Sequence, residues 1–325
     1  MHGARTVAIV IPSWNSLRLL PRCLGSLRDQ GTGVELLVVD NGSGDGSVAY
    51  LEREGVPHVA LPRNAGFAAA VNLGVARTES EAILVLNADT VLEPECAGRL
   101  LDGLEADSSL GGVQPRLLQL EAAAEEAPAA VASARVYSAG QALTADGRAV
   151  ERGAGERQRP ELLARREVFG VCGAACLLRR DLFAELGGYD ERYFAFYEDV
   201  DLNVRGRIAG WRFEYLPDAV VWHVGNATWS EGFSRPAADN ARLVARNRLS
   251  TQVKFMPVNA VPRIAVVEAG SLLRAAAQRR FLATLGGKLA ALRRLPGLLG
   301  DRRRLRRSGD LSLAQRWLGR GTEQL

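Results

Sequence analysis

Short apolar runs and amphipathic segments alternate along the first 110 residues of the chain. The runs are rich in β-branched side chains and end at proline, glycine or polar positions, a pattern typical of buried strands. Between them, apolar residues recur at helical spacing. This pattern predicts strands at 6–12, 34–39, 56–61 and 82–86, and helices at 17–30, 48–54, 66–76 and 93–106. Such alternation predicts an α/β fold with a doubly wound, mostly parallel sheet.

The later part of the chain is less regular. Residues 120–167 show little periodicity and are interpreted as a long, partly mobile substrate loop with short hairpin strands near 134–137. Asp181 is a good N-cap for a helix that ends at Gly187. The remaining predictions are strands at 112–118, 171–180, 211–216 and 219–223, and a helix at 199–209.

The fourth predicted strand ends at two polar side chains. Four consecutive apolar residues, 83–86, indicate a strand that is buried on both faces, and Asn87 and Asp89 follow it directly. Ligands of open parallel sheets bind beyond the carboxyl ends of the strands, so these side chains are expected to face a polar ligand such as a metal-bound phosphate. An Asx turn after a buried strand would explain the same residues.

Charge is distributed unevenly. The formal net charge is +4, but residues 240–325 carry 18 Lys and Arg against 4 Asp and Glu, which leaves −10 for the preceding residues. We therefore expect the basic residues 240–325 to have a different role from the acidic part of the chain that precedes them. The four cysteines, Cys23, Cys96, Cys172 and Cys176, lack CxxC spacing, which argues against a zinc site and predicts buried, reduced thiols in a cytoplasmic protein.

Residues 272–305 mix leucine and alanine with arginine and lysine, the composition of a basic amphipathic helix. Arginines within 302–307 would add attraction to anionic lipids. We therefore expect a protein that lies at the inner face of the cell membrane without a signal peptide or a membrane-spanning helix. A helix packed on the rest of the chain or on a second subunit would fit the same pattern. Nucleic-acid binding is disfavoured because interleaved aromatic residues are lacking.

Five segments in a fixed order, at 10–15, 38–43, 63–67, 87–89 and 187–202, resemble the inverting glycosyltransferase family that includes cellulose and chitin synthases. The similarity is greatest to its bacterial rhamnosyltransferase-like branch. It implies a GT-A fold. The resemblance covers residues 6–255, so we expect a catalytic domain at 1–255 and a basic helical tail at 256–325.

The resemblance also implies a donor-binding group. The end of the first strand would line the nucleotide-base pocket, Asp40 would accept hydrogen bonds from the base or ribose, and the glycine-containing loop would close on the nucleotide. From the residues alone, Asp40 could equally form a turn before Asn41, and Gly66 could begin a helix. The donor-binding residues implied are Pro12, Trp14, Asn15, Asp40, Asn64, Gly66, Phe67, Asn72, Asn87 and Asp89.

Asn87, Ala88 and Asp89 occupy the place of the family's D-x-D motif, so Asp89 would bind Mg²⁺ or Mn²⁺ beside the donor diphosphate. Asn87 carries no charge and is expected to form hydrogen bonds rather than bind the metal directly. His223, at the end of a predicted strand, is a candidate further metal ligand, although a lone histidine is as often structural.

Inversion requires a base that deprotonates the acceptor hydroxyl. The resemblance assigns this base to Asp199 and gives Glu198 an orienting or acceptor-binding role. Asp201 is two residues further along a helix, so its side chain should point elsewhere and act as a charge at the helix start. The aromatic residues at 193–197 suit stacking on a sugar and partial desolvation of the base.

The predicted function is a metal-dependent inverting glycosyltransferase of cell-surface glycan synthesis. Its donor would be a dTDP, UDP or GDP sugar, with dTDP-rhamnose one candidate, and its acceptor a lipid-linked glycan or polysaccharide. A sugar nucleotidyltransferase would need a glycine-rich, basic N-terminal loop, which residues 10–15 do not supply. A non-catalytic nucleotide-sugar-binding or scaffold subunit of a synthase complex stays open because Asn87 weakens the metal motif. The oligomeric state is also open.

Overall fold

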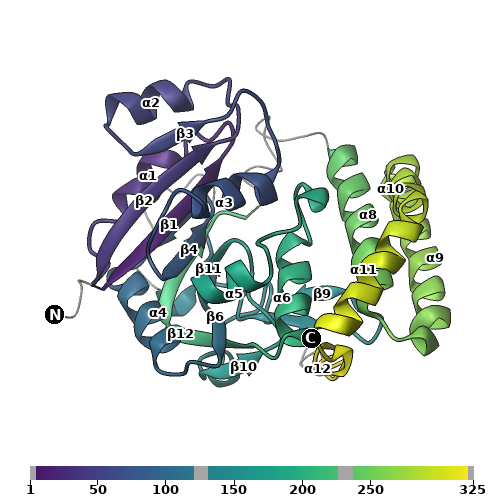
Figure 1. Cartoon of the computed structure of the whole chain (residues 1–325). Helices are drawn as coiled ribbons and strands as arrows, with labels where there is room; N and C mark the ends of the chain where they lie inside the picture. Colours follow the sequence, from purple (N-terminus) through teal and green to yellow (C-terminus); the bar gives the residue numbers. More distant parts are fainter. Residues whose placement is uncertain (1–4, 121–130, 226–236, 321–325) are drawn as a thin grey trace.

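The computed structural model describes residues 5–120, 131–225 and 237–320. Its central feature is a mixed sheet with the order β10-β12-β6-β11-β4-β1-β2-β3, on which β5 pairs with β12 and β7 with β6 (Figure 1). The strands are β1 (Thr6–Ser13), β2 (Gly33–Asp40), β3 (His58–Ala60), β4 (Ala82–Leu86), β5 (Thr90–Leu92), β6 (Leu110–Gln119), β7 (Val136–Ser138), β10 (Arg166–Val168), β11 (Ala175–Arg179) and β12 (Arg212–His223). The predicted α/β fold is confirmed.

Strands β1 to β4 pair in parallel, as the alternating pattern predicted. Strand β11 is antiparallel to both of its neighbours and connects this half to a second parallel pair, β6 and β12. The sequence predicted two strands where the structure has the single strand β12. A shift of register between Leu216 and Val220 accounts for the difference, because Pro217 lies there and lacks a backbone N–H for the ladder.

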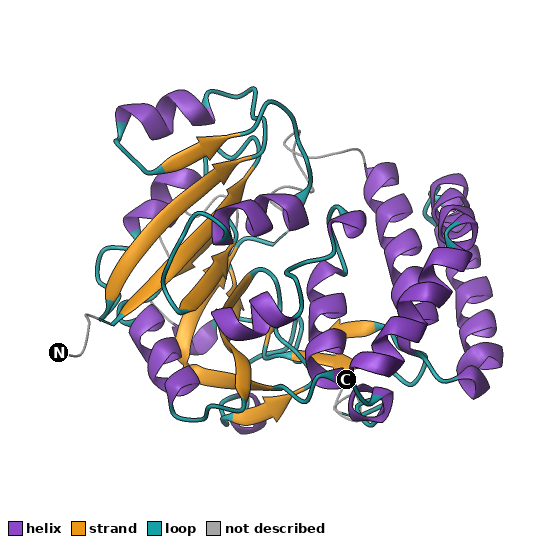
Figure 2. Cartoon of the chain, in the orientation of Figure 1, coloured by secondary structure: helices purple, strands orange, loops and turns teal. Residues whose placement is uncertain are grey.

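Helices cover both faces of the sheet (Figure 2). Residues of one strand point to opposite faces in turn. Val7, Ile9 and Ile11 of β1 pack toward one face, while Val10 packs toward the other. The first face is covered by α1 (Leu20–Gly25), α2 (Ser47–Arg53) and α4 (Cys96–Glu105), and the second by α3 (Phe67–Val75), α5 (Arg180–Glu185) and α6 (Glu198–Ile208). Strand β4 is buried along its whole length, which confirms the prediction of a doubly covered strand.

Several local predictions were wrong. The first helix is shorter than predicted, and β5 was not anticipated. The described part of 120–167 is largely ordered, since it contains β7, β10 and a separate hairpin of β8 (Gln141–Leu143) and β9 (Ala149–Glu151). Strands of three residues show too few alternations to be recognised in a sequence. Residues 121–130 of the predicted loop lie outside the described residues.

In the described residues after β12, five helices follow the sheet: α8 (Ala237–Phe255), α9 (Val261–Ala277), α10 (Phe281–Arg293), α11 (Leu295–Ser308) and α12 (Leu311–Gln315). The single amphipathic helix expected at 272–305 is therefore divided among α9, α10 and α11. One apolar cluster unites side chains of α6, including Val204 and Ile208, with Phe255, Leu305 and Leu311. The helices begin with α8, before the predicted boundary at residue 255, and this shared core crosses that boundary. Among the described residues, no helix is both long and apolar enough to span a bilayer.

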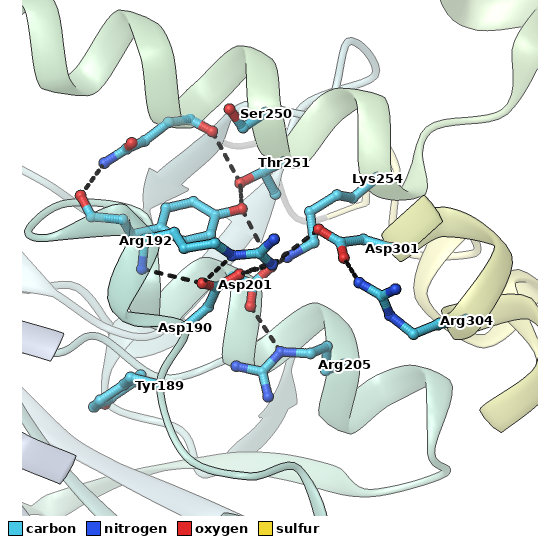
Figure 3. Close-up of polar contacts among 12 residues, drawn as sticks. Tyr189, Asp190, Arg192, Asp201, Arg205, Ser250, Thr251, Lys254, Asp301 and Arg304 are labelled. Atoms are coloured by element: carbon cyan, nitrogen blue, oxygen red, sulfur yellow. Dashed lines mark hydrogen bonds and ion pairs between the residues drawn. The ribbon is translucent and has the colours of Figure 1, made fainter. Parts of the chain in front are cut away.

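Ion pairs join the helical part, which comprises α8 to α12 (237–315), to the sheet-containing part, residues 6–223 (Figure 3). Lys254 of α8 is buried and pairs with Asp201 of α6, and it also lies 3.3 Å from Asp190. Arg192 bridges Asp190 at 2.6 Å and Asp301 of α11 at 2.9 Å. Asp201 does point away from the cavities described below, as its spacing predicted, but it is buried in an ion pair.

Candidate active site

Two adjoining cavities open where strands β1 and β4 end. The first has a volume of about 220 Å³ and is lined by residues 12–14 of the β1 end. The second, about 300 Å³, is lined by residues 196–200 at the start of α6. Phe67, Asn87 and Asp89 line both. Strand β1 lies between β2 and β4, so the cavities occupy the point where strand order reverses, the usual ligand site of such sheets.

Six of the ten predicted donor-binding residues line the first cavity: Pro12, Trp14, Asn64, Phe67, Asn87 and Asp89. Asn15 is placed differently. Its backbone is left-handed, with φ of 51°, its N–H donates to the Ser43 hydroxyl at 2.8 Å, and its side-chain oxygen accepts from the Gly44 N–H at 2.9 Å. Asn15 therefore braces the loops after β1 and β2 against each other.

Asp40 is fully buried and forms the turn that the sequence left open as an alternative. Its Oδ1 accepts from the N–H groups of Gly42 at 3.1 Å and Ser43 at 2.9 Å. Its Oδ2 is buried without a hydrogen-bond partner among the described residues. The neighbouring Asn41, which the sequence did not single out, lines the first cavity instead. The only sequence signal for Asn41 was its place within the motif 38–43.

The glycine-containing loop at 63–67 packs directly against the aromatic loop at 193–197. Gly66 has φ of 100°, and a β-carbon there would lie 2.5 Å from the Phe194 carbonyl oxygen. Asn41 fixes the same loop, since its side chain accepts from the Ala65 N–H at 2.8 Å and donates to the Gly66 carbonyl at 3.0 Å. Asn72 does not line either cavity. Its amide instead pairs with the backbone of Tyr189 in both directions, at 2.9 Å each.

Asp89 and His223, the two predicted metal ligands, lie side by side. Both are buried, and the His223 Nε2 is 3.1 Å from Asp89 Oδ1. Strand β12 pairs with β5 at this point, which brings the end of β12 to the end of β4. The His223 Nδ1 is buried and has no hydrogen-bond partner in the part of the chain that the structure describes, and the ring packs edge-on against Tyr137.

The donors of this pair fit a divalent cation in part. A carboxylate oxygen and an imidazole nitrogen are both ligands of Mn²⁺-like ions. The described residues contain no group of three His, Cys, Asp or Glu side chains placed to hold a metal ion. A cation held by Asp89 and His223 would therefore need further ligands from a bound diphosphate or water. Asn87, which lines both cavities, is uncharged and suits a hydrogen bond to such a ligand.

Glu198 and Asp199 line the second cavity at the start of α6. Burial raises the pKa of Asp199 above its usual value, although N–H groups of Gly173 at 2.9 Å and Val200 at 2.7 Å partly offset this. Burial and the adjacent charge of Asp199 raise the pKa of Glu198 well above its usual value. Asp199 thus has the desolvated setting of a general base, and Glu198 favours its protonated form.

Two residues that the sequence did not identify, Gln141 and Glu151, are connected to Asp199 by hydrogen bonds, Gln141 directly and Glu151 through Gln141. The side-chain nitrogen of Gln141 donates to Asp199 Oδ2 at 2.9 Å and to Glu151 Oε1 at 3.1 Å. Both residues line the second cavity. They lie on the β8–β9 hairpin, within the segment that appeared irregular, so no periodicity marked them.

The loop before α6 is held in an uncommon conformation. Phe194, Phe196 and Tyr197 have positive φ values of 68°, 68° and 69°. Asn247 of α8 donates from its amide to the carbonyls of Tyr193, Ala195 and Phe196 at 2.9, 2.8 and 2.7 Å. The helix after the sheet therefore helps to position the start of α6.

The chain is similar to known proteins over most of the sheet-containing part. The family model described as Glycosyl transferase family 2 matches residues 8–116. N-acetylglucosaminyl-diphospho-decaprenol L-rhamnosyltransferase of Mycobacterium tuberculosis is 30% identical over 209 residues, which cover 58% of this chain and 66% of that protein, just under two thirds of its length. Undecaprenyl-phosphate 4-deoxy-4-formamido-L-arabinose transferase of Pseudomonas paraeruginosa is 35% identical over 106 residues, 30% of this chain and 31% of that one.

Solved structures show the same fold at low sequence identity. GalNAc-T7 with UDP, GalNAc and Mn²⁺ aligns with a TM-score of 0.60 and 14% identity, over 79% of this chain and 49% of that chain. Mannosyltransferase PcManGT from Pyrobaculum calidifontis, in complex with GDP-Man and Mn²⁺, aligns with a TM-score of 0.50 and 17% identity, over 97% and 87% of the two chains. The alignments support the predicted GT-A fold.

Proposed function

Because this chain belongs to glycosyl transferase family 2, we propose that it is an inverting glycosyltransferase that moves a sugar from a nucleotide donor to a lipid-linked acceptor. The mycobacterial relative is named for transfer of L-rhamnose to a lipid-diphosphate acceptor, which favours rhamnose as the sugar. The observation that carries the proposal is the pair of cavities that meet at Asn87 and Asp89, one lined by Asp199. In this reading, the first cavity holds the nucleotide and the second holds the acceptor.

Asp199 is proposed to take the proton of the acceptor hydroxyl. The acceptor oxygen forms a bond to the anomeric carbon as the bond from that carbon to the diphosphate breaks, so no covalent sugar–enzyme intermediate forms. A raised pKa suits Asp199 to this role, because a base is most effective when its pKa lies near the working pH. Glu198, which favours its protonated form, would donate a hydrogen bond in the same cavity.

Asp89 and His223 are the residues that would hold Mg²⁺ or Mn²⁺. When bound, the cation would neutralise charge that develops on the leaving diphosphate. Removal of divalent metal with excess EDTA is expected to abolish transfer, and MnCl₂ is expected to restore it. Full activity in excess chelator would contradict metal dependence.

The function is tested first by replacing the base. Asp199→Asn should reduce transfer by about 10²–10⁴-fold while leaving nucleotide binding intact. Donors can be found by a thermal-shift screen of dTDP, UDP and GDP sugars with Mn²⁺, since a ligand at about a hundred times its Kd stabilises by about 2.7 kcal/mol. Asp181→Asn, an exposed change on α5, is the matched control. Wild-type turnover by a folded Asp199→Asn protein would refute the assignment, and absence of turnover in the wild type would favour a non-catalytic subunit.

The helical part is proposed to rest on an anionic membrane surface, where a lipid-linked acceptor would lie. Val266 and Leu273 of α9 and Leu282 of α10 are 74%, 76% and 81% exposed. Arg279 and Arg280, also exposed, lie in the turn between the two helices. Exposed apolar side chains beside arginines suit the interface of a bilayer, with about 1 kcal/mol of attraction per basic residue.

The membrane proposal is tested by co-sedimentation of the full chain with vesicles. Binding is expected to phosphatidylglycerol-containing vesicles and not to pure phosphatidylcholine, and Leu273→Ser combined with Leu282→Ser should weaken it. Leu163→Ser, an exposed leucine 44% accessible in the sheet-containing part, serves as control. Equal sedimentation of the control and the double variant would argue against this surface.

A further inference from the structure

A third carboxylate faces the second cavity together with Glu198 and Asp199. Glu151 lies on β9, and its carboxyl group is linked to Asp199 through the side-chain nitrogen of Gln141, which donates to both. The orientation of the Gln141 amide is fixed, because its oxygen accepts from the Asn203 amide at 2.9 Å. The two carboxylates therefore share one donor and hold a constant spacing.

The far side of Glu151 is also fixed. The Ser138 hydroxyl donates to Glu151 Oε2 and accepts from the Gln114 amide at 2.8 Å. Gln114 in turn accepts from the Cys172 N–H at 2.6 Å. Ser138 and Gln114 are buried. This network holds the carboxyl group at the cavity wall without using all of its acceptor capacity, since a carboxylate offers about four acceptor sites.

The chemistry of the cavity indicates what Glu151 binds. Burial raises the pKa of Glu151 to about 7, and the charge of Asp199 adds to this effect while the Ser138 hydroxyl opposes it. Among the described residues, four carboxyl groups line the same cavity, those of Asp89, Glu151, Glu198 and Asp199. Such a wall suits a neutral ligand that presents several hydroxyl groups, because carboxyl groups can both accept and, when protonated, donate hydrogen bonds.

Resting on the transferase activity proposed above, we propose that Glu151 binds a second hydroxyl group of the acceptor sugar, adjacent to the hydroxyl that Asp199 deprotonates. Glu151 changes no covalent bond in the reaction. Its hydrogen bond orients the acceptor ring, so that the reacting oxygen faces Asp199 and the anomeric carbon of the donor. The site thereby selects acceptor sugars with two neighbouring hydroxyl groups.

The test compares acceptors that each lack one hydroxyl group. An N-acetylglucosaminyl-diphospho-lipid and its monodeoxy analogues are used with the wild-type chain, Glu151→Ala and Glu151→Gln. Removing the hydroxyl next to the reacting one should lower the wild-type kcat/KM by about 10- to 100-fold, as expected for loss of a hydrogen bond to a charged group. In both Glu151 variants the same removal should cost less than about threefold. Glu161→Gln, an exposed change on the same segment, should behave as wild type.

The outcomes separate the two proposals. Thermal unfolding and titration with a nucleotide sugar, which is proposed to bind in the first cavity, show whether the Glu151 variants are folded. If the variants transfer sugar and discriminate against deoxy acceptors as strongly as the wild type, the role of Glu151 is refuted and the transferase proposal stands. If the wild type transfers to none of the acceptors and does not hydrolyse the donor, the proposed function fails.

Discussion

Gly66 shows how a single residue permits a close contact between two loops beside the candidate site. Its φ of 100° lies in the region that side chains other than glycine rarely adopt. A β-carbon would also lie 2.5 Å from the Phe194 carbonyl oxygen and 2.8 Å from its ring. Glycine is required on both grounds, and the contact joins the first turn of α3 to the loop before α6.

Replacement of Gly66 by alanine is therefore expected to destabilise the protein and weaken nucleotide binding. Backbone strain alone should cost about 1–3 kcal/mol, and the loop at Phe194 must move as well. Thermal unfolding and titration with a nucleotide sugar measure the two effects. Gly44→Ala is the matched control, because nothing lies within 4 Å of a β-carbon there. Equal melting temperatures for the two variants would show that the contact is unimportant.

At the scale of elements, α8 contacts the loop before α6, residues 193–197, through Asn247. Three residues of that loop have left-handed backbone conformations, each of which costs free energy unless its surroundings impose it. The Asn247 amide donates to three carbonyl groups of that backbone, those of Tyr193, Ala195 and Phe196. A helix outside the sheet therefore supports the geometry of Glu198 and Asp199.

The Asn247→Ala variant should lose activity more than it loses donor affinity. Without the amide, the loop can relax and displace Asp199, and a shift of about 1 Å can cost about 10²-fold in rate. We expect kcat to fall by at least about 10-fold while the Kd for the nucleotide sugar changes little. The exposed Asn259→Ala variant provides the comparison. An unchanged kcat would mean that the loop keeps its conformation without Asn247.

For the whole molecule, the buried pair of Lys254 and Asp201 connects the helical part to the sheet-containing part. Burial acts to raise the pKa of Asp201, but the charges of Lys254 and Arg205 outweigh it and hold that pKa below its usual value. Burial also acts to raise the pKa of Asp190, but Arg192 and Lys254 lower it below its usual value. Depressed carboxyl pKa values stabilise the fold above the unfolded pKa near 3.8, and this stabilisation is lost as the pH falls.

Lys254→Met should accordingly destabilise the protein at neutral pH by up to about 3–5 kcal/mol, since it removes one of the two cations that compensate each of Asp190 and Asp201. The difference in unfolding free energy between this variant and the wild type should shrink as the pH falls from 7 towards 3. Protonation of the carboxylates removes the negative charge that Lys254 compensates. Urea unfolding at several pH values measures the difference. Combining Lys254→Met with Asp201→Asn should recover part of the loss. A difference that does not vary with pH would exclude this electrostatic origin.

The sequence by itself determined the fold class, the strands β1 to β4, and five motif segments that hold most of the candidate site. These features are local: apolar periodicity specifies an element, and the residues at strand ends share one edge of a parallel sheet. The family resemblance, whose motifs lie at these strand ends, assigned Pro12, Trp14, Asn64, Phe67 and Asn87 to the donor site, and all five line the first cavity.

Tertiary structure decided the rest. Asn72 belongs to the right helix but pairs with Tyr189, and Asn15 braces a neighbouring loop, because side-chain direction depends on packing partners distant in sequence. Gln141 and Glu151 reach Asp199 only after a hairpin of three-residue strands folds against α6. Such short strands carry no readable period, and their contacts are long-range, so no local pattern could reveal them.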